Sequence, residues 1–452
     1  MGQLFGTDGI RGIANVDLKA ELAFKVGQAA AVVLAKGKES KPVIIIGKDT
    51  RISSDMLEAA LIAGICSSGA DVVPLGVVPT PAVAFITAKV KADAGIVISA
   101  SHNPYAYNGI KIFNGQGYKL SDNLENEMES LVLSGHELPL KINGEMGCVL
   151  SGGEDYVEMY IKSIAAASEH VSGLKVVFDC ANGASSRTAK SIFKKLPIEI
   201  VMINDKPNGT NINNCCGSTN TESLGNTVVK LGYDIGVAFD GDADRCIIVD
   251  EKGNEIDGDT MMAVCGEAMK KAGKLKKETI VATVMSNIGF KLFAAEREIK
   301  LLYSAVGDRN VLELMLKSGA SLGGEKSGHL IFLDESTTGD GQLAAAKFLN
   351  IVSETRKTVS ELAGQIKHFP QLILNVPIEG GNAKKNAIMA DAVVCAHIAQ
   401  AEQELGETGR VLVRPSGTED LIRVMVEARN IAQVEEVTNR LAQIIRARMN
   451  IC

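Results

Sequence analysis

A repeating pattern of short apolar runs separated by helix-length segments most strongly limits the folds open to this chain. The runs are KPVIIIG (41–47), ADVVPLG (70–76), AGIVISA (94–100), LKVVFDC (174–180), IGVAFD (235–240) and TIVATVM (279–285). Runs of this length, rich in β-branched residues, are typical of parallel strands buried on both faces. Their alternation with helices indicates an α/β fold. The pattern therefore predicts three successive mixed-sheet α/β domains.

The pattern changes after residue 370. A strand (QLILNVP), a long amphipathic helix over 383–405, two strands flanking RPSGTED and a closing helix from Gln433 follow. This order is typical of a smaller α+β domain. With 452 residues, the chain is too long for one ordinary domain. The predicted domains cover residues 1–152, 153–257, 258–370 and 371–452.

Composition excludes several classes of partner. The chain has 47 Lys and Arg against 54 Asp and Glu, a net charge of −7, and no long basic run, so no nucleic-acid partner is expected. The 9 cysteines are scattered and form no repeated CxxC framework, which indicates reduced thiols in the cytoplasm. Neither a signal peptide nor an apolar stretch long enough to span a bilayer is seen, so no membrane partner is expected.

Two segments carry candidate nucleophilic and basic groups. The run AGIVISA ends at Ser101-His102-Asn103-Pro104, and ligands of open α/β sheets bind where parallel strands end. A serine hydroxyl is a weak nucleophile, so a covalent role for Ser101 requires activation or a phosphorylated resting state. A turn capped by Asn-Pro explains the segment equally well. Lys111 is either a general base or a plain surface lysine.

Three carboxylates follow the run IGVAF, at Asp240, Asp242 and Asp244 in the segment DGDADR. Oxygen ligands at this spacing on one short turn suit a hard divalent cation. Glu251 stands twelve positions into the segment, as in an EF-hand, but CIIVD is strand-like where an EF-hand needs a helix. A solvated acidic turn is the alternative interpretation.

Three glycine-rich segments offer groups for an anionic or hydroxylated ligand. RPSGTED carries Arg414, two hydroxyls and a glycine, which suits a phosphate held by a guanidinium fork and backbone amides. GGEKSGH (323–329) offers carboxylate, hydroxyl and imidazole groups for sugar hydroxyls. GTDGIRG (6–12) holds Arg11 in a glycine-rich turn. Each segment taken alone is also compatible with an ordinary surface turn.

Together these segments resemble the α-D-phosphohexomutase superfamily, in which a serine loop, a DGDxDR metal loop, a GE-x-SGH sugar loop and an R-x-S-x-T phosphate loop occur in this order. All four are present here, one in each predicted domain. The segments FGTDGIRGIAN, ISASHNPYAYNGIKIF, NCCGSTN and VRPSGTEDLIRVMVEA are most similar to the members that act on glucosamine phosphate. Lys326 stands where those members commonly have Gln, which bears on the choice of sugar and not on the reaction class.

The resemblance implies a role for each matching residue, in four domains around a central cleft. Ser101 is implied to be a phosphoserine, and one of its oxygens is implied to join Asp240, Asp242 and Asp244 as a ligand of one Mg²⁺ per subunit. The residues implied in proton and charge handling are Lys111, Arg11 and His102. The residues implied to contact substrate are Arg245, Glu325, Ser327, His329, Arg309, Arg414, Ser416, Gly417 and Thr418.

The implied reaction interconverts glucosamine 6-phosphate and glucosamine 1-phosphate through a 1,6-bisphosphate, with glucosamine or glucose 1,6-bisphosphate as activator. Its product would supply UDP-N-acetylglucosamine, a cell-wall precursor. The same chemistry on glucose or mannose phosphate is the nearest alternative. A non-catalytic sugar-phosphate sensor and a phosphatase are more remote. A homodimer is compatible with the sequence, which does not determine the oligomeric state.

Overall fold

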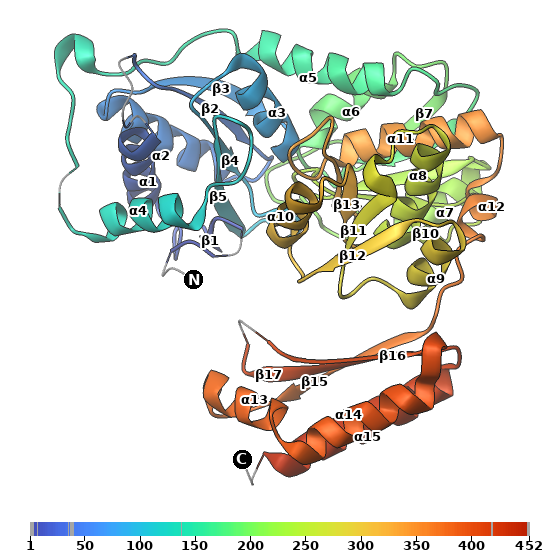
Figure 1. The fold of residues 1–452 in the computed structure, drawn as a ribbon. Coiled ribbons are helices and arrows are strands. Elements are labelled where there is room, and N and C mark those ends of the chain that lie inside the picture. Colours follow the sequence, from blue (N-terminus) through green and yellow to red (C-terminus); the bar gives the residue numbers. More distant parts are fainter. Residues whose placement is uncertain are drawn as a thin grey trace. The chain divides into compact units, whose positions relative to one another are not determined.

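The computed structural model describes residues 4–6, 8–34, 36, 40–136, 138–416 and 419–449. The chain forms two compact units (Figure 1). The first comprises Met1–Met285 and Ile299–Gly364, and the second comprises Ser286–Glu298 and Gln365–Cys452.

The first sheet of the larger unit has the order β1-β5-β4-β2-β3. Its strands are β1 (Ile10–Ile13), β2 (Val43–Lys48), β3 (Asp71–Val77), β4 (Ala94–Ile98) and β5 (Tyr107–Asn114). Its helices are α1 (Ala20–Leu34), α2 (Ser54–Ser67), α3 (Thr80–Val90) and α4 (Asp122–Leu133). β2 pairs in parallel with β3 and β4, whereas β5 is antiparallel to both β4 and β1. Because α1 packs against α2 and α4, and α3 against β2 and β4, the central strands are buried.

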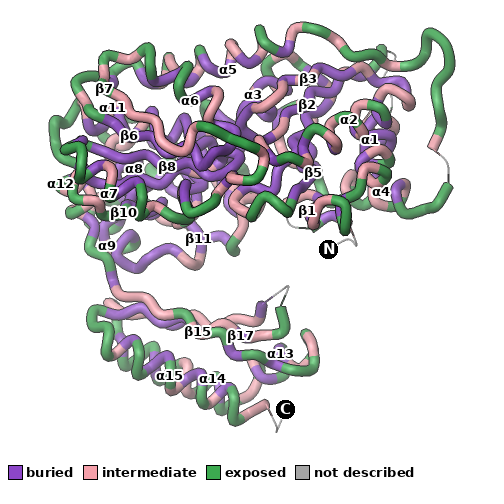
Figure 2. The backbone as a smooth tube through the Cα atoms, turned by 180° about the vertical axis from the view of Figure 1, so that it is seen from behind, coloured by how far each residue is buried: buried purple, intermediate pink, exposed green. Residues whose placement is uncertain are grey.

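The second sheet has the order β10-β9-β8-β6-β7. Its strands are β6 (Lys175–Asp179), β7 (Glu199–Ile203), β8 (Ile235–Phe239), β9 (Cys246–Val249) and β10 (Glu255–Ile256). Its helices are α5 (Gly153–Ala167), α6 (Ser185–Phe193) and α7 (Glu222–Leu231). β6 and β8 are parallel neighbours and are buried along most of their length (Figure 2). Burial on both faces explains why these strands are continuous apolar runs without alternation.

The third sheet has the order β12-β11-β13-β14. Its strands are β11 (Thr279–Thr283), β12 (Lys300–Ser304), β13 (Leu322–Gly324) and β14 (Leu330–Phe332). Its helices are α8 (Gly258–Lys271), α10 (Asp308–Ser318), α11 (Gly341–Thr355) and α12 (Val359–Ala363). Short 3₁₀ turns η1 (Asn143–Glu145) and η2 (Lys276–Glu278) complete the larger unit. β11, β12 and β13 run parallel, and β14 is antiparallel to β13.

The smaller unit contains an antiparallel sheet of order β15-β17-β16. Its elements are α9 (Ile288–Glu296), β15 (Gln371–Pro377), α13 (Gly381–Met389), α14 (Ala392–Leu405), η3 (Gly406–Thr408), β16 (Arg410–Pro415), β17 (Leu421–Glu427) and α15 (Ile431–Arg448). The prediction of one helix over 383–405 is wrong. The chain breaks at Asp391, whose carboxylate accepts hydrogen bonds from the N–H groups of Val393 and Val394 and so begins a new helix.

These sheets confirm the predicted fold class of three mixed-sheet α/β domains followed by a smaller α+β domain. The residue limits of the four domains stay a prediction. None of the helices in the described part of the chain combines the length and apolar character that crossing a bilayer requires.

Candidate active site

Ser101 lies just beyond the carboxyl end of β4 and is 1% exposed. Its Oγ donates a hydrogen bond of 2.6 Å to Oδ2 of Asp240, which is 139 residues away in sequence. The same Oγ lies 3.3 Å from Nδ1 of His102. The serine loop is therefore in direct contact with the segment DGDADR.

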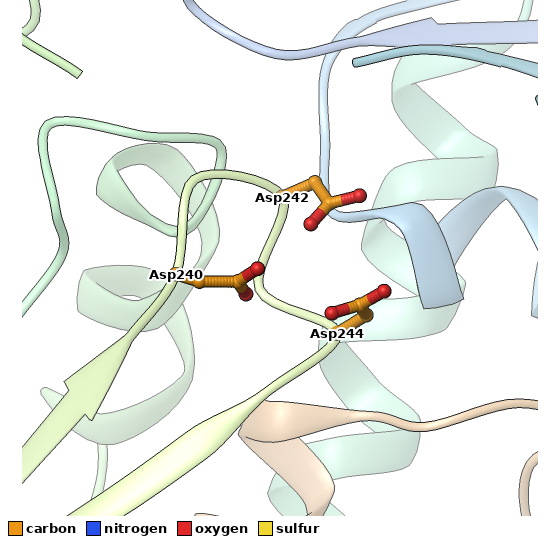
Figure 3. A group of neighbouring side chains, drawn as sticks. All are labelled: Asp240, Asp242 and Asp244. Atoms are coloured by element: carbon orange, nitrogen blue, oxygen red, sulfur yellow. The ribbon is translucent and has the colours of Figure 1, made fainter. Parts of the chain in front are cut away.

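The three predicted carboxylates form a buried cluster on the turn between β8 and β9 (Figure 3). Asp240, Asp242 and Asp244 each offer a ligand atom within 4.8 Å of the others. Gly241 is required for the approach of the two loops, because a Cβ there would lie 2.5 Å from the carbonyl oxygen of Ser101. The small residues of DGDADR thus bring the carboxylates against the serine.

The electrostatics of this cluster fit a divalent cation. The Oδ1 atoms of Asp242 and Asp244 are buried and have no hydrogen-bond partner. Burial raises the pKa of Asp240, and the neighbouring charges of Asp244 and Asp242 raise it further. Three buried carboxylates on one turn are unfavourable unless positive charge compensates them, and a hard cation with oxygen ligands would add to the charge that the neighbouring Lys111 supplies. The predicted ligand set is therefore suited to Mg²⁺.

Lys111, on β5, is 2% exposed and lies among the carboxylates. Its Nζ is 2.9 Å from Asp242, 3.1 Å from Asp8 and 3.6 Å from Asp244. Burial alone would lower the pKa of Lys111, but Asp242, Asp8 and Asp244 together raise it. Lys111 is therefore a buried cation, which favours charge stabilisation over proton abstraction.

Two arginines and a histidine also lie close to these carboxylates. Arg11 pairs with Asp8, and Nε of Arg245 lies 3.8 Å from Oδ1 of Asp244. Burial, with the charges of Arg245 and Arg11, lowers the pKa of His102 to about 4, although Asp244 opposes the shift. At neutral pH the imidazole of His102 is therefore uncharged.

The segment predicted to contact a sugar forms the turn between β13 and β14. Oε1 of Glu325 accepts a hydrogen bond of 2.9 Å from the N–H of Gly307, and Ser327 is exposed. His329 is 2% exposed, and its Nδ1 lies 3.7 Å from Oδ2 of Asp244. Burial opposes a charge on His329, but the contact with Asp244 raises its pKa.

Several of these groups line one cavity of about 540 Å³. Its lining includes Asp8, Arg11, Asp244, Arg245, Arg309, Glu325 and His329. Arg309 is already occupied, because its guanidinium pairs with Asp122 at 2.6 Å and with Glu125 on α4. The cavity is large enough to hold a small phosphorylated molecule.

In the smaller unit, Arg414 and Ser416 stand at the end of β16, whereas Gly417 and Thr418 lie outside the described residues. Arg414 on β16 lies directly opposite Arg423 on the antiparallel strand β17. Burial and the charge of Arg423 lower the pKa of Arg414. Two like charges opposite each other are unfavourable. The ion pair of Arg423 with Glu419, at 2.5 Å, offsets part of this repulsion, and an anion beside Arg414 would offset more of it.

Several residues that lie in the site were not predicted from the sequence. Lys119 pairs with both Asp8 and Asp308, and Oγ1 of Thr80 donates a hydrogen bond of 2.6 Å to Oδ2 of Asp242. Asp8 stands in GTDGIRG, three residues before Arg11, and Asp308 directly precedes Arg309. The sequence therefore already placed both aspartates beside candidate residues. Thr80 gives no local signal, since its contact spans 162 residues.

Models of the phosphoglucomutase/phosphomannomutase family match four successive parts of the chain. Alpha/beta/alpha domain I matches residues 2–138, domain II matches 154–253, domain III matches 257–369 and the C-terminal domain matches 373–444. Phosphoglucosamine mutases of Clostridium novyi (strain NT) and Clostridium acetobutylicum are each 50% identical, over 100% of both chains. That of Acetivibrio thermocellus is 50% identical over 99% of this chain and 100% of its own.

Solved structures share the fold. A phosphoglucomutase/phosphomannomutase family protein from Burkholderia thailandensis has a TM-score of 0.82 at 25% identity, covering 99% of this chain and 98% of its own. N-acetylphosphoglucosamine mutase of Aspergillus fumigatus, solved with GlcNAc-6P and magnesium, has a TM-score of 0.70 at 16% identity, covering 98% and 95%. On its full-length identity to the bacterial proteins, the chain belongs to the phosphoglucosamine mutase family of the phosphohexomutase superfamily.

Proposed function

We propose that the chain interconverts glucosamine 6-phosphate and glucosamine 1-phosphate, with Ser101 as the phosphoryl carrier. The observation that carries the proposal is the hydrogen bond of 2.6 Å between Ser101 Oγ and Asp240, in a cluster of buried carboxylates. A hydroxyl held against a candidate metal site is suited to phosphoryl transfer, which depends mainly on positioning and charge stabilisation. The full-length similarity to phosphoglucosamine mutases supports the choice of substrate.

Asp240, Asp242 and Asp244 would hold one Mg²⁺, together with an oxygen of phosphoserine 101. The buried Oδ1 atoms of Asp242 and Asp244, which accept no hydrogen bond, support this assignment. When bound, the ion would neutralise charge on the phosphoryl oxygens and orient them. Lys111, which contacts two of the three carboxylates, adds a fixed positive charge from the protein itself.

In the first step, O1 of glucosamine 6-phosphate attacks the phosphorus of phosphoserine 101. The bond between phosphorus and Ser101 Oγ breaks, a bond between phosphorus and O1 forms, and the proton of O1 is transferred to Ser101 Oγ. Neutral His102, whose Nδ1 lies 3.3 Å from that Oγ, would accept this proton and pass it on. Arg11 and Lys111 would stabilise the negative charge of the moving group.

The second step needs the 1,6-bisphosphate to turn over, so that its 6-phosphate faces Ser101. Ser101 Oγ then attacks that phosphorus, the bond to O6 breaks, and O6 takes the serine proton. The groups proposed to hold the non-reacting phosphate are Arg414, Ser416, Gly417 and Thr418. Those proposed to hold the sugar are Arg245, Glu325, Ser327, His329 and Arg309, of which Arg309 would first have to give up its pairing with Asp122. Added glucosamine or glucose 1,6-bisphosphate would activate the enzyme by phosphorylating Ser101.

The alternative of glucose or mannose phosphate differs by one ring substituent. Lys326, the one departure noted in the sugar loop, has its Nζ 3.9 Å from Asp257. A direct test compares turnover of glucosamine 6-phosphate with that of glucose 6-phosphate, with Mg²⁺ and a bisphosphate. Faster turnover of glucosamine 6-phosphate is expected, and equal or faster turnover of glucose 6-phosphate would favour a phosphoglucomutase. Turnover of neither sugar would leave the sensor as the better interpretation.

A further inference from the structure

The backbone of Ser101 is in an unusual conformation. Its φ is 51°, in the left-handed region that residues other than glycine rarely adopt. Such a conformation persists only where the surroundings determine it. The direction of the Ser101 side chain, and so its contact with Asp240, depends on this backbone. The groups that hold the Ser101 backbone therefore also control the direction of its hydroxyl.

Arg51 is the residue that contacts this backbone most extensively. Its side chain is 0% exposed and its guanidinium points into the serine loop. Nη2 donates to the carbonyl oxygens of Ser101 and Asn103, each at 2.8 Å. Nη1 donates to those of Pro104, at 2.5 Å, and Tyr107, at 3.0 Å. One side chain thus binds four carbonyls of the segment 101–107.

Asp49 extends the same network to the other side of Ser101. Its Oδ2 accepts hydrogen bonds from Nε of Arg51, at 2.8 Å, and from Oγ of Ser99, at 2.7 Å. Oγ of Ser99 in turn accepts a hydrogen bond of 2.9 Å from the N–H of Ser101. Both the N–H and the carbonyl of Ser101 are therefore connected to one buried ion pair.

A second hydrogen-bond donor to the serine loop is Asn213, which lies on the segment between β7 and α7. Nδ2 of Asn213 donates to the carbonyl oxygen of Ser101 at 2.9 Å and to that of Asn103 at 3.1 Å. These are the two carbonyls that Nη2 of Arg51 also binds. The same conformation is thus held independently from two parts of the chain.

We propose that Arg51, fixed by Asp49, is a positioning residue that holds Ser101 in the left-handed conformation required for phosphoryl transfer. This inference rests on the proposed role of Ser101 as carrier. Arg51 acts through the loop and contacts no reacting atom. Loss of the Arg51 guanidinium should displace Ser101 and slow the chemical step, because misplacement of a reacting group by about 1 Å can cost about a hundredfold in rate. Substrate affinity should change little, since the proposed sugar and phosphate contacts lie on other loops.

The principal test is Arg51→Lys, measured in the full chain with Mg²⁺ and bisphosphate. Lysine keeps the charge beside Asp49 but lacks the planar fork that reaches several carbonyls. We expect kcat to fall by about ten- to a hundredfold, from the cost of misplacement, with KM within about twofold. The ³¹P resonance of phosphoserine 101 should also shift. Arg187→Lys is the matched control: its guanidinium donates to the Leu75 carbonyl and pairs with Glu154, so both kinetic constants should be retained.

A milder variant keeps the proposal testable if Arg51→Lys does not fold. Asn213→Ala removes two bonds to the same carbonyls and should lower kcat severalfold at unchanged KM. Its control is Asn211→Ala, in the same loop, where the lost side-chain bonds are to Lys206 and Asn208.

Two outcomes would overturn the positioning role. One is a folded Arg51→Lys enzyme with unchanged kcat and ³¹P resonance. The other is a loss that appears only in KM. Ser101→Ala separates this failure from failure of the proposed function. If Ser101→Ala is inactive while Arg51→Lys is normal, only the positioning role fails. If Ser101→Ala retains turnover, the carrier role itself fails.

Discussion

Replacing Lys111 with methionine should destabilise the metal-free protein and tighten its binding of Mg²⁺. Lys111 is 2% exposed and has three carboxylates within 3.6 Å. Two charges about 4 Å apart interact by about 4 kcal/mol at an effective dielectric constant of about 20. Removing one partner of a buried pair typically costs about 3–5 kcal/mol. We therefore expect a loss of about that size in the free energy of unfolding, measured by urea denaturation in EDTA.

Mg²⁺ should reverse part of this loss, because it would replace the positive charge that the carboxylates have lost. A tenfold tighter dissociation constant corresponds to about 1.4 kcal/mol, and we expect at least that change by titration calorimetry. Lys119→Met is the matched control, since Lys119 pairs with Asp8 and Asp308 and not with the aspartate cluster. It should lower stability without changing Mg²⁺ affinity. Unchanged or weaker Mg²⁺ binding by Lys111→Met would refute the inference that Lys111 and Mg²⁺ compensate the same carboxylate charge.

Three further predictions concern separate parts of the molecule. Asp242→Asn should weaken Mg²⁺ binding, and EDTA should stop turnover reversibly without unfolding the protein; activity that resists EDTA would count against a catalytic metal. Arg414→Ala should lower kcat/KM by at least about tenfold and release free 1,6-bisphosphate, whereas Arg414→Lys should restore only part of the loss. Burial raises the pKa of Asp340 from 3.8 to about 6, so its contribution to stability is greatest below pH 3.8 and is lost as the pH rises through 6. By urea denaturation, the stability of Asp340→Asn relative to wild type should therefore rise between about pH 4 and about pH 6, and a pH-independent difference would contradict the raised pKa of Asp340.

Much of the fold could be predicted because buried parallel strands leave a local signal. Residues 44–46 of β2 are fully buried, so both faces of the strand require apolar side chains and the run is uninterrupted. The break in the helix predicted over 383–405 was missed because no Gly or Pro interrupts that stretch. It depends on one side chain, Asp391, which caps α14 and also pairs with Arg448.

The site residues that could be predicted are those that stand together in short motifs. The three aspartates stand on one turn, so their clustering follows from spacing alone. By contrast, the contacts of Ser101 with Arg51 and Asn213 span 50 and 112 residues. Their side chains are ordinary in local sequence, and only the folded sheets bring them to the serine loop. The catalytic and binding roles of the individual residues stay predictions.

Direct transfer of the phosphoryl group from Ser101 is the central claim. The decisive measurement mixes enzyme labelled with ³²P on Ser101 with unlabelled glucosamine 6-phosphate and Mg²⁺, and quenches the reaction within one turnover. We predict that label leaves Ser101 and appears in glucosamine 1,6-bisphosphate and then in glucosamine 1-phosphate. If glucosamine 1-phosphate forms while the label stays on Ser101, or if the label is released only as inorganic phosphate, Ser101 is not the carrier.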